Sequence, residues 1–405
     1  DETIKTNPSP IIAPPERATR PAAQNLRAPG MLRISRYART KGVSHTPVTV
    51  RSGAGSVTSD VRPWWTDAMR STVIHGAGDV RLEDRPDPAI IKPTDAIVRT
   101  VATCVCGSDL WRYRGIGDVP KPVAIGHEYC GVVEQVGSAV TGVSVGQFVV
   151  GGFYHCDNTC PTCRKGAQAN CPNGGAYDGC QAELIRIPNA DGTLVATPEL
   201  PSEDQIPDLL TLSDVMGTGW HAAVSAGVGP GMSVAVVGDG AVGLCAVLAA
   251  AQLGAEQVIA MSRHEDRQQL AIEFGATAII AERDEAGAAK VRELTEGIGA
   301  DAVLECVGTE QSRLQALACA RPGATIGTVG LPHGQLPADK LFWRNVGLAG
   351  GPAPVRAYLP ALMELVLAGR IHPGKVFDLE LPLAEVAEAD AAMDARRAIK
   401  VLLRP

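Results

Sequence analysis

A glycine-rich segment between an apolar run and an alanine-rich run constrains the fold most. Gly238, Gly240 and Gly243 occur with GxGxxG spacing in SVAVVGDGAVGLCAVLAAAQLG. In such a segment the first glycine permits a tight turn, the second lets the backbone approach a pyrophosphate, and the third lets a helix pack closely on a strand. The helix N-terminus also offers free N–H groups to an anion. The segment therefore predicts a dinucleotide site that includes Ala241 and Val242.

The pattern of apolar and turn-forming residues divides the chain into regions. Residues 216–354 alternate buried strand-like runs with Ala/Leu-rich helical runs, which predicts a Rossmann-type, doubly wound parallel sheet. Residues 69–215 contain short β-branched runs separated by Gly, Pro and Asp, which predicts a mostly antiparallel, barrel-like domain. Residues 355–405 look helical with short strands, and we expect them to return to the first domain. The fold class is therefore α/β.

The first 68 residues differ from the rest in composition. They are rich in Pro, Ser, Arg and Ala, without sustained apolar periodicity, and we expect a disordered extension. Their Arg/Ser bias would also suit a transit peptide. Ordered patterning begins abruptly at Met69, where a translation start would be natural, so our preferred hypothesis is that residues 1–68 are dispensable.

The charge distribution bears on possible partners. Residues 1–68 hold ten Lys/Arg and five Asp/Glu, whereas residues 69–405 hold 27 Lys/Arg and 39 Asp/Glu. An acidic body argues against nucleic acid or an anionic membrane surface as the main partner. No apolar run approaches the roughly 20 residues of a membrane helix, and the N-terminus lacks the apolar core of a secretory signal. We expect a small-molecule substrate and a cytoplasmic protein.

Four cysteines crowd into one short segment. Cys156, Cys160, Cys163 and Cys171 fall within sixteen residues of GFYHCDNTCPTCRKGAQANC. Four thiolates in one loop can complete a tetrahedral zinc shell and stabilise a segment that has few apolar residues. The spacing therefore predicts a structural zinc site.

A second set of metal-binding residue types is dispersed, as is usual for a catalytic metal. Its members are Cys106 in TCVCGSDLW, His127 and Glu128 in AIGHEYCG, and Asp214 in LSDVMGTGWHAA. Singly each residue is a weak signal, but their order before a dinucleotide fold makes the combination specific. We predict a zinc ion held by Cys106, His127 and Asp214, with one position open for substrate.

The residues after the second strand of the dinucleotide unit bear on cofactor choice. NAD-binding units usually place Asp or Glu there for the ribose 2′-hydroxyl, but this strand ends in Met261 and is followed by Ser262 and Arg263. A hydroxyl followed by a guanidinium can bind a 2′-phosphate through charge-assisted hydrogen bonds. We therefore favour NADP over NAD, with Arg267 as a further cofactor-binding residue. Alternatively, Arg263 stacks on adenine or caps the next helix.

These motifs together resemble the zinc-dependent medium-chain alcohol dehydrogenase family over residues 69–405. The resemblance rests on CGSDL at 106–110, GHE at 126–128, the cysteine-rich segment, GDGAVG, and the closing GGPAPVRAY and RRAIKVLL. It implies a GroES-like catalytic domain, a Rossmann domain, and interconversion of an alcohol and an aldehyde with zinc and a nicotinamide cofactor. By analogy it also implies a homodimer or homotetramer.

The resemblance assigns roles to individual residues. Cys106 and His127 match catalytic zinc ligands, and Asp214 stands where many members have cysteine and some have aspartate. Glu128 matches an acidic neighbour that approaches zinc during ligand exchange, and Ser108 matches the hydroxyl that takes the alcohol proton.

Further matches extend to the surroundings of the zinc and to the nicotinamide. Asp109 matches a carboxylate that orients the zinc-binding histidine, and Thr218 sits where the family contacts nicotinamide. Val329 and Gly330, after a strand, are expected to present backbone groups to the nicotinamide amide.

Two positions depart from the family pattern. Members often have histidine at the end of a proton relay where this chain has Trp111, so the proton must leave through the cofactor ribose, water or another base. Trp111 either narrows the substrate entrance or is a packed aromatic. The usual cysteine spacing would place the first structural ligand at Asp157, but zinc prefers thiolate, so we choose Cys156 with Asp157 as the alternative.

Other functions remain open at the level of sequence. Within the superfamily, the chain could be a polyol, threonine or glutathione-adduct dehydrogenase. From a different class, it could be a non-catalytic nucleotide-binding protein that kept the fold. The set Cys106, His127 and Asp214 favours an enzyme.

Overall fold

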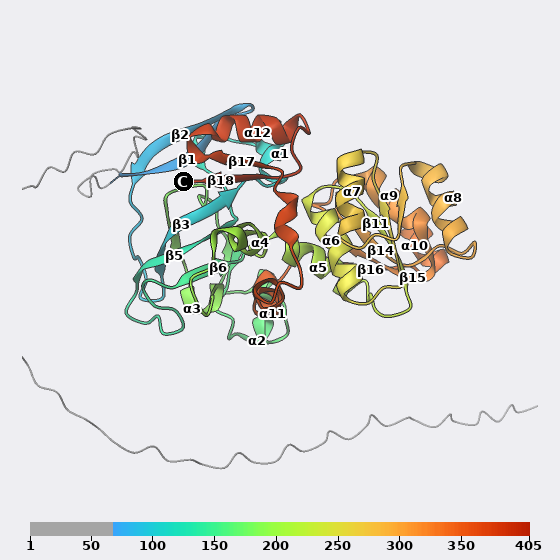
Figure 1. Ribbon diagram of the computed structural model, residues 1–405, viewed down its shortest axis with the longest axis horizontal. Coiled ribbons are helices and arrows are strands. Elements are labelled where there is room, and N and C mark those ends of the chain that lie inside the picture. Colours follow the sequence, from blue (N-terminus) through green and yellow to red (C-terminus); the bar gives the residue numbers. More distant parts are fainter. Residues whose placement is uncertain (1–67) are drawn as a thin grey trace, which may run out of the picture. The chain divides into compact units, whose positions relative to one another are not determined.

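The computed structural model describes residues 68–405, so the predicted extension lies outside the described residues except for Ala68. A mostly antiparallel β region comes first in the chain and a parallel sheet flanked by helices follows (Figure 1). The first region contains β1 (Ala68–Gly76), β2 (Asp79–Pro86), β3 (Ala96–Cys104), α1 (Asp109–Tyr113), β4 (Val123–Ala124), β5 (Tyr129–Val136), β6 (Phe148–Gly151), β7 (Tyr154–His155), α2 (Pro161–Arg164), η1 (Gln168–Asn170), β8 (Gly175–Ala176), β9 (Leu184–Ile187), α3 (Ala190–Thr193), β10 (Leu194–Ala196), η2 (Glu203–Gln205) and α4 (Ile206–Thr211).

The second region begins with a long helix and closes with a return to the first sheet. It contains α5 (Val215–Ser225), β11 (Ser233–Val237), α6 (Ala241–Gln252), β12 (Gln257–Met261), α7 (Glu265–Glu273), β13 (Ala278–Ile280), α8 (Asp284–Leu294), β14 (Ala300–Glu305), α9 (Glu310–Cys319), β15 (Ala320–Thr328), α10 (Ala338–Arg344), β16 (Gly347–Gly350), α11 (Val355–Leu367), η3 (Pro373–Val376), β17 (Leu379–Pro382), η4 (Leu383–Glu385), α12 (Val386–Asp394) and β18 (Val401–Arg404).

Strand β3 organises the catalytic region. It pairs antiparallel with β5, β9 and β18, and Leu402 of β18 lies opposite Cys104 of β3. The C-terminal strands β17 and β18 thereby join the sheet that contains β3. Strand β3 ends at Cys104, just before the candidate ligand Cys106. Figure 1 shows the C-terminal segment, with α12, β17 and β18, next to β1 and β2.

The second sheet has the order β13-β12-β11-β14-β15-β16, and all of its pairings are parallel. Strand β11 lies in the middle, with β12 on one side and β14 on the other. The chain runs from β11 to β12 on one side, and later from β13 across to β14 on the other side of β11. The carboxyl end of β11 is therefore the topological switch point, where ligands bind in doubly wound sheets. The glycine-rich segment follows β11 directly.

Alternate residues of β11 enter two different cores. Val234 and Val236 pack in the core that includes α5 and α6, whereas Ala235 and Val237 pack in the core that includes α8 and α9. Because successive side chains of a strand point to opposite faces, a strand covered on both faces must be apolar throughout. This explains the uninterrupted run VAVV and confirms the predicted α/β class.

Close packing of α5 on α6 connects the metal ligands with the glycine loop. A Cβ on Gly219 of α5 would lie 2.6 Å from the backbone nitrogen of Ala246 in α6, so only glycine fits. Asp214 immediately precedes α5, and Gly240 immediately precedes α6. No helix in residues 68–405 has the length and apolar character needed to cross a bilayer.

Candidate metal and dinucleotide site

Four side chains from three separate stretches of chain converge in the catalytic region. Ligand atoms of Cys106, His127, Glu128 and Asp214 all lie within 4.8 Å of one another. The Cys106 thiol is 3.7 Å from Asp214 Oδ2, and His127 Nε2 is 3.4 Å from the same oxygen. The structure thus brings together the three predicted zinc ligands and the acidic neighbour.

Asp109 orients two members of this group. Its Oδ2 accepts a hydrogen bond from the backbone N–H of Cys106 at 3.0 Å, and its Oδ1 lies 3.6 Å from His127 Nδ1. Gln181 Nε2 also donates to Asp109 Oδ2, so this oxygen accepts two hydrogen bonds. With Nδ1 facing Asp109, His127 presents Nε2 to Cys106 and Asp214.

The pKa values of these side chains reflect burial and the closeness of several acidic groups. Burial lowers the pKa of His127, but the charges of Cys106 and Asp109 outweigh it, and the pKa lies well above its usual value. Burial raises the pKa of the Cys106 thiol. Burial would also raise the pKa of Asp214, but its hydrogen bond with His127 lowers it overall. A bound cation would balance the charge of the carboxylates in this buried place.

Glu128 belongs to this cluster and is tied to a buried lysine. The Lys400 ammonium donates to Glu128 Oε1 at 2.7 Å and to the Val105 carbonyl at 3.1 Å, and both side chains are almost completely buried. The other oxygen, Glu128 Oε2, is buried without a hydrogen-bond partner. No pattern in the sequence predicts a role for Lys400, because a lysine in a terminal strand usually reaches solvent.

The donor set fits a zinc ion. A thiol, an imidazole and a carboxylate are all zinc ligands, and these three come from distant stretches of the chain, as in catalytic sites. The unpartnered Glu128 Oε2 adds a buried lone pair with nothing to bind among the described residues. The chemistry of the group therefore suits a divalent metal better than an internal ion-pair network.

Thr218, which the resemblance places beside the nicotinamide, is hydrogen-bonded to the metal ligand Asp214. Its Oγ1 donates to Asp214 Oδ1 at 2.6 Å, and its backbone N–H donates to the Asp214 carbonyl. The hydroxyl therefore leaves Asp214 Oδ2 as the oxygen that faces Cys106 and His127. Thr218 supports the metal group in this structure.

Ser108 and Trp111 lie at the edge of the group. Ser108 Oγ is 3.5 Å from His127 Nε2, and Trp111 follows one turn later in α1. The indole of Trp111 packs on the imidazole of His333, with ring centroids 3.4 Å apart. His333 follows β15, so this contact links the catalytic region to the dinucleotide region. Trp111 is therefore packed between the regions.

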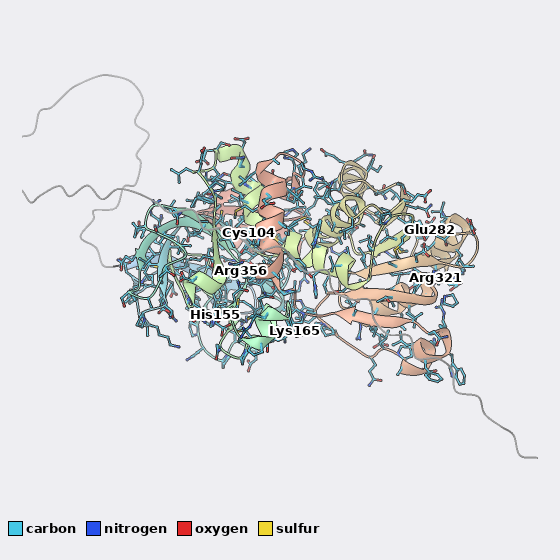
Figure 2. The ribbon with its side chains drawn as sticks, turned by 90° about the horizontal axis from the view of Figure 1, so that it is seen from below. Cys104, His155, Lys165, Glu282, Arg321 and Arg356 are labelled. Carbon is cyan, nitrogen blue, oxygen red and sulfur yellow. The ribbon has the colours of Figure 1, made fainter. Side chains whose placement is uncertain are left out.

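The cysteine-rich segment forms a second potential metal group. Ligand atoms of Asp157, Cys160, Cys163 and Cys171 lie within 4.8 Å of one another. Asp157 accepts hydrogen bonds from the Asn173 amide and from the backbone N–H groups of Cys160 and Thr159, which lower its pKa. Figure 2 shows His155 and Lys165, which bracket the first part of this segment.

Cys156, the preferred first ligand in the sequence interpretation, is not in that group. Its thiol donates to the Gly192 carbonyl at 3.1 Å, and its backbone N–H donates to Thr193 Oγ1. A Cβ on Gly192 would lie 2.1 Å from the Cys156 carbonyl, so close packing fixes this backbone. Burial raises the pKa of the Cys156 thiol to about 11. Cys156 packs in one cluster with the other three cysteines, but Asp157 is the residue whose ligand atom lies within 4.8 Å of all three of their sulfur atoms.

The glycine loop has the features of a phosphate cradle. Gly238 has φ +117°, a conformation that L side chains rarely adopt, and a Cβ on Gly243 would lie 2.0 Å from the Gly238 carbonyl. A Cβ on Gly240 would meet nothing within 4 Å, so the backbone there borders open space. Ala241 and Val242 form the first turn of α6. The loop fits a dinucleotide pyrophosphate at the helix N-terminus.

The residues after β12 contact the glycine loop. Ser262 Oγ donates to Asp239 Oδ2 at 2.8 Å, and Arg267 Nη1 lies 3.5 Å from Asp239 Oδ1. Arg263 is exposed. Asp239 was not singled out from the sequence, because the residue between the first two glycines has no prescribed type in the motif.

Val329 and Gly330 follow β15 at the same edge of the sheet. Their backbone N–H groups donate to the Glu305 carbonyl at 3.0 and 3.3 Å. The Glu305 carboxylate accepts from the backbone of Val307 and Gly308 and from two hydroxyl groups, so it holds this edge together. A buried glutamate at the end of an apolar strand was a signal that the sequence analysis did not use.

Comparisons with known proteins agree with the fold and the motifs. The zinc-binding dehydrogenase family matches residues 241–366, and the alcohol dehydrogenase GroES-like domain matches residues 92–199. A probable zinc-binding alcohol dehydrogenase of Mycobacterium tuberculosis is 37% identical over 83% of this chain and 89% of its own length. An L-threonine 3-dehydrogenase of Symbiobacterium thermophilum is 32% identical over 80% of this chain and 94% of its own length.

Solved structures show the same architecture. An alcohol dehydrogenase from Thermus sp. ATN1 superimposes with a TM-score of 0.77 at 32% identity, over 83% of this chain and 99% of that one. A zinc-binding dehydrogenase from Sinorhizobium meliloti, solved with NADP, gives 0.71 at 25% identity, over 84% of this chain and 100% of that one. The fold and the relatives define a class of zinc-type oxidoreductases. The chain belongs to the zinc-dependent medium-chain alcohol dehydrogenase family, as the sequence predicted.

Proposed function

We propose that this chain interconverts an alcohol and an aldehyde or ketone with NAD(P), at a zinc ion held by Cys106, His127 and Asp214. The observation that carries the proposal is the convergence of these ligand atoms within 4.8 Å. Close packing of α5 on α6 joins this group to the glycine loop. A non-catalytic nucleotide-binding protein would have no use for the buried donor set.

The chain's own residues prepare the metal group. The Asp109 carboxylate lies against His127 Nδ1, and the Thr218 hydroxyl donates a hydrogen bond to Asp214 Oδ1. The Lys400 ammonium balances the charge of Glu128. Zinc bound there supplies a Lewis acid that lowers the pKa of an alcohol hydroxyl. The resemblance gives Glu128 a role in ligand exchange, and its unpartnered Oε2 is the oxygen available for that role.

Ser108 is the proposed proton acceptor for the alcohol hydroxyl. Its Oγ lies at the edge of the metal group, 3.5 Å from His127 Nε2. Trp111 has no group that accepts a proton from Ser108, so the proton leaves through the cofactor ribose, water or another base.

The cofactor is a nicotinamide dinucleotide, for which we favour NADP. Gly238, Gly240 and Gly243 would hold the pyrophosphate, and Ser262, Arg263 and Arg267 offer a hydroxyl and two guanidinium groups to a 2′-phosphate. Nicotinamide supplies the hydride acceptor for alcohol oxidation. The NADP in the Sinorhizobium meliloti structure supports this preference.

The cysteine-rich segment is proposed to bind a structural zinc ion through Asp157, Cys160, Cys163 and Cys171. Three thiolates and one carboxylate complete a tetrahedral shell. This assignment replaces Cys156 with the sequence alternative Asp157, because the Cys156 thiol is committed to the Gly192 carbonyl.

A second copy of the chain is the proposed partner of strand β16. Among the described strands, β16 pairs only with β15 and so ends the sheet. Phe342 and Trp343, just before it, are 72% and 80% exposed, and Leu348 within it is 43% exposed. An unpaired edge with apolar neighbours favours edge-to-edge association. A homodimer formed there is our proposal, and the cytoplasmic location predicted from sequence stays a prediction.

The test of the function is a reduced-nicotinamide absorbance assay on the zinc-loaded chain. The panel includes primary alcohols, aldehydes, threonine and polyols, because relatives are named for threonine and for D-xylulose. We expect turnover that stops when zinc is stripped, returns when zinc is restored, and is absent in Cys106→Ala. Turnover that survives zinc removal and Cys106→Ala would refute the proposed metal site.

A further inference from the structure

The carboxylate of Asp239 occupies the place where cofactor selection is expected. Val237 at the end of β11 and Met261 at the end of β12 are partners in register, so the residues that follow them share one edge of the sheet. Asp239 reaches across this edge and accepts the hydrogen bond of Ser262 at 2.8 Å. In nucleotide-binding sheets of this kind, the adenosine ribose lies at the end of the second strand.

Two of the three proposed phosphate ligands are engaged by this carboxylate. Ser262 is 1% exposed and donates its hydroxyl to Asp239, and Arg267 lies 3.5 Å from the other carboxylate oxygen. The side chains of Arg267 and Asp239 are only 11% and 15% exposed. Because water is largely excluded, charge interactions among these groups are screened less than at an open surface.

The two cofactors differ in what they would place beside Asp239. The 2′-phosphate of NADP carries negative charge and competes with the carboxylate for Ser262 and Arg267. The 2′-hydroxyl of NAD carries no charge and can donate a hydrogen bond to a carboxylate. The remaining proposed ligand, Arg263, is exposed and can approach either cofactor.

We propose that Asp239 is a specificity-determining residue that restrains the preference for NADP. The inference rests on the proposed dinucleotide function and deepens it. Ser262, Arg263 and Arg267 attract the 2′-phosphate, and the Asp239 carboxylate opposes it. The native chain therefore discriminates less strongly between NADP and NAD than its two arginines alone would dictate.

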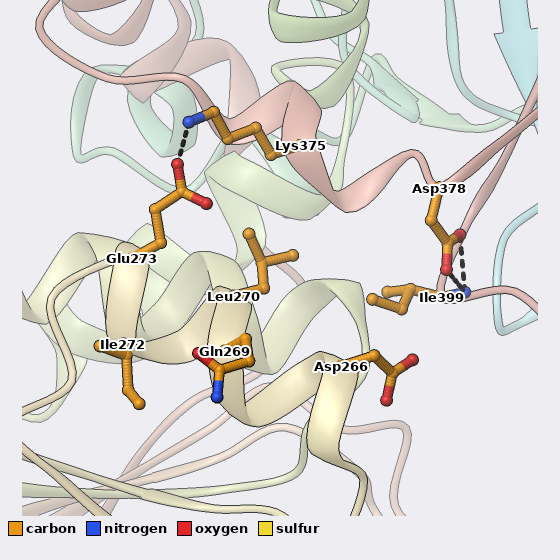
Figure 3. Close-up of a pocket in the computed structure, with 8 residues that line it drawn as sticks. All are labelled: Asp266, Gln269, Leu270, Ile272, Glu273, Lys375, Asp378 and Ile399. Atoms are coloured by element: carbon orange, nitrogen blue, oxygen red, sulfur yellow. Dashed lines mark hydrogen bonds and ion pairs between the residues drawn. The ribbon is translucent and has the colours of Figure 1, made fainter.

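The substitution that tests this is Asp239→Asn, which keeps the shape and the contact with Ser262 while removing the charge. Asp266→Asn is the matched control, because Asp266 is an exposed carboxylate near the start of α7. It lines a surface pocket with Gln269, Lys375 and Ile399 (Figure 3) and, within the described residues, forms no hydrogen bond with Ser262 or Asp239. Asp239→Ser is a second variant should the asparagine protein fold poorly.

Binding is measured by calorimetry on the full, zinc-loaded chain with 2′,5′-ADP and 5′-AMP, which differ only in the 2′-phosphate. NADPH and NADH are then titrated by fluorescence. We expect Asp239→Asn to raise the affinity ratio of 2′,5′-ADP to 5′-AMP by about tenfold or more, because one like charge beside the phosphate is removed. The ratio should be unchanged in Asp266→Asn.

Three results separate the failure of this inference from that of the proposed function. If the native chain binds both dinucleotides but the ratio changes less than about twofold in both Asp239 variants, then Asp239 does not select the cofactor. A change of the same size in Asp266→Asn also refutes the inference, because a general charge effect would then suffice. If the native chain binds none of the four compounds, the dinucleotide function itself fails, and the inference fails with it.

Discussion

Replacing the buried carboxyl group of Asp390 by an amide should stabilise the protein, most strongly at neutral and alkaline pH. Asp390 lies in α12, is 0% exposed, and has no hydrogen-bond partner on either carboxylate oxygen. Burial, together with the nearby charges of Asp109 and Asp394, raises its pKa to about 8. The folded protein therefore holds this carboxyl group protonated at neutral pH.

The direction of the effect follows from the difference between the folded and unfolded pKa. An unfolded aspartate has a pKa of about 3.9, so the unfolded chain releases the proton at a much lower pH than the folded chain. Below about pH 4 the carboxyl group is protonated in both states, so it does not lower the free energy of unfolding. As the pH rises from there to about 8, the free energy of unfolding falls. At about 1.36 kcal/mol per pH unit, the free energy of unfolding decreases by roughly 4 kcal/mol between pH 4 and pH 7.

The assay is denaturant unfolding of the zinc-saturated chain between pH 5 and pH 8, for the native protein and Asp390→Asn. We expect the stability difference in favour of the variant to grow by about 3 to 4 kcal/mol across this range, because asparagine has no proton to release. Glu388→Gln is the control, since Glu388 lies on the same helix but is about half exposed and paired with Arg397. A pH dependence that is identical in the native protein and Asp390→Asn would refute the reasoning.

Three further predictions concern the metal groups and the sheet edge. Lys400→Met should lower the free energy of unfolding by about 3 kcal/mol and speed zinc loss to a chelator, because it leaves Glu128 as a buried charge without its cation. Denaturant unfolding and chelator curves that match those of the native protein would contradict this prediction. Zinc analysis should give two ions per chain for Cys156→Ser and about one for Asp157→Ala, and the reverse pattern would restore Cys156 as the ligand. Trp343→Glu should shift the chain from dimer to monomer in light scattering, and a dimer of undiminished stability would place the interface elsewhere.

The sequence predicted those parts of the molecule that depend on local pattern. The α/β class follows from strand-helix alternation, and the glycine loop follows from residues that are near one another in the chain. The convergence of Cys106 with Asp214, 108 residues later, is expected from the order of the ligand-type residues and from the resemblance to a family, because no local pattern joins the two residues. Neither composition nor spacing states which distant residues the fold brings together.

The unpredicted features are contacts between side chains that look ordinary in the sequence. Lys400 and Glu128 are 272 residues apart, and their pairing depends on β18 lying beside β3. Asp239 meets Ser262 because two neighbouring strands end in register. Asp157 completes the group of ligand atoms with the three later cysteines, although thiolate is the better zinc ligand by type and Cys156 packs beside the same cysteines.

The most direct test of the account is a crystal structure with anomalous scattering recorded at the zinc edge. The account predicts an ion bound about 2.3 Å from the Cys106 sulfur and about 2.0 to 2.2 Å from His127 nitrogen and Asp214 oxygen. It also predicts a second ion among Asp157 and the three neighbouring cysteines. Anomalous density that is absent between Cys106, His127 and Asp214 in zinc-saturated, active protein would contradict the central claim.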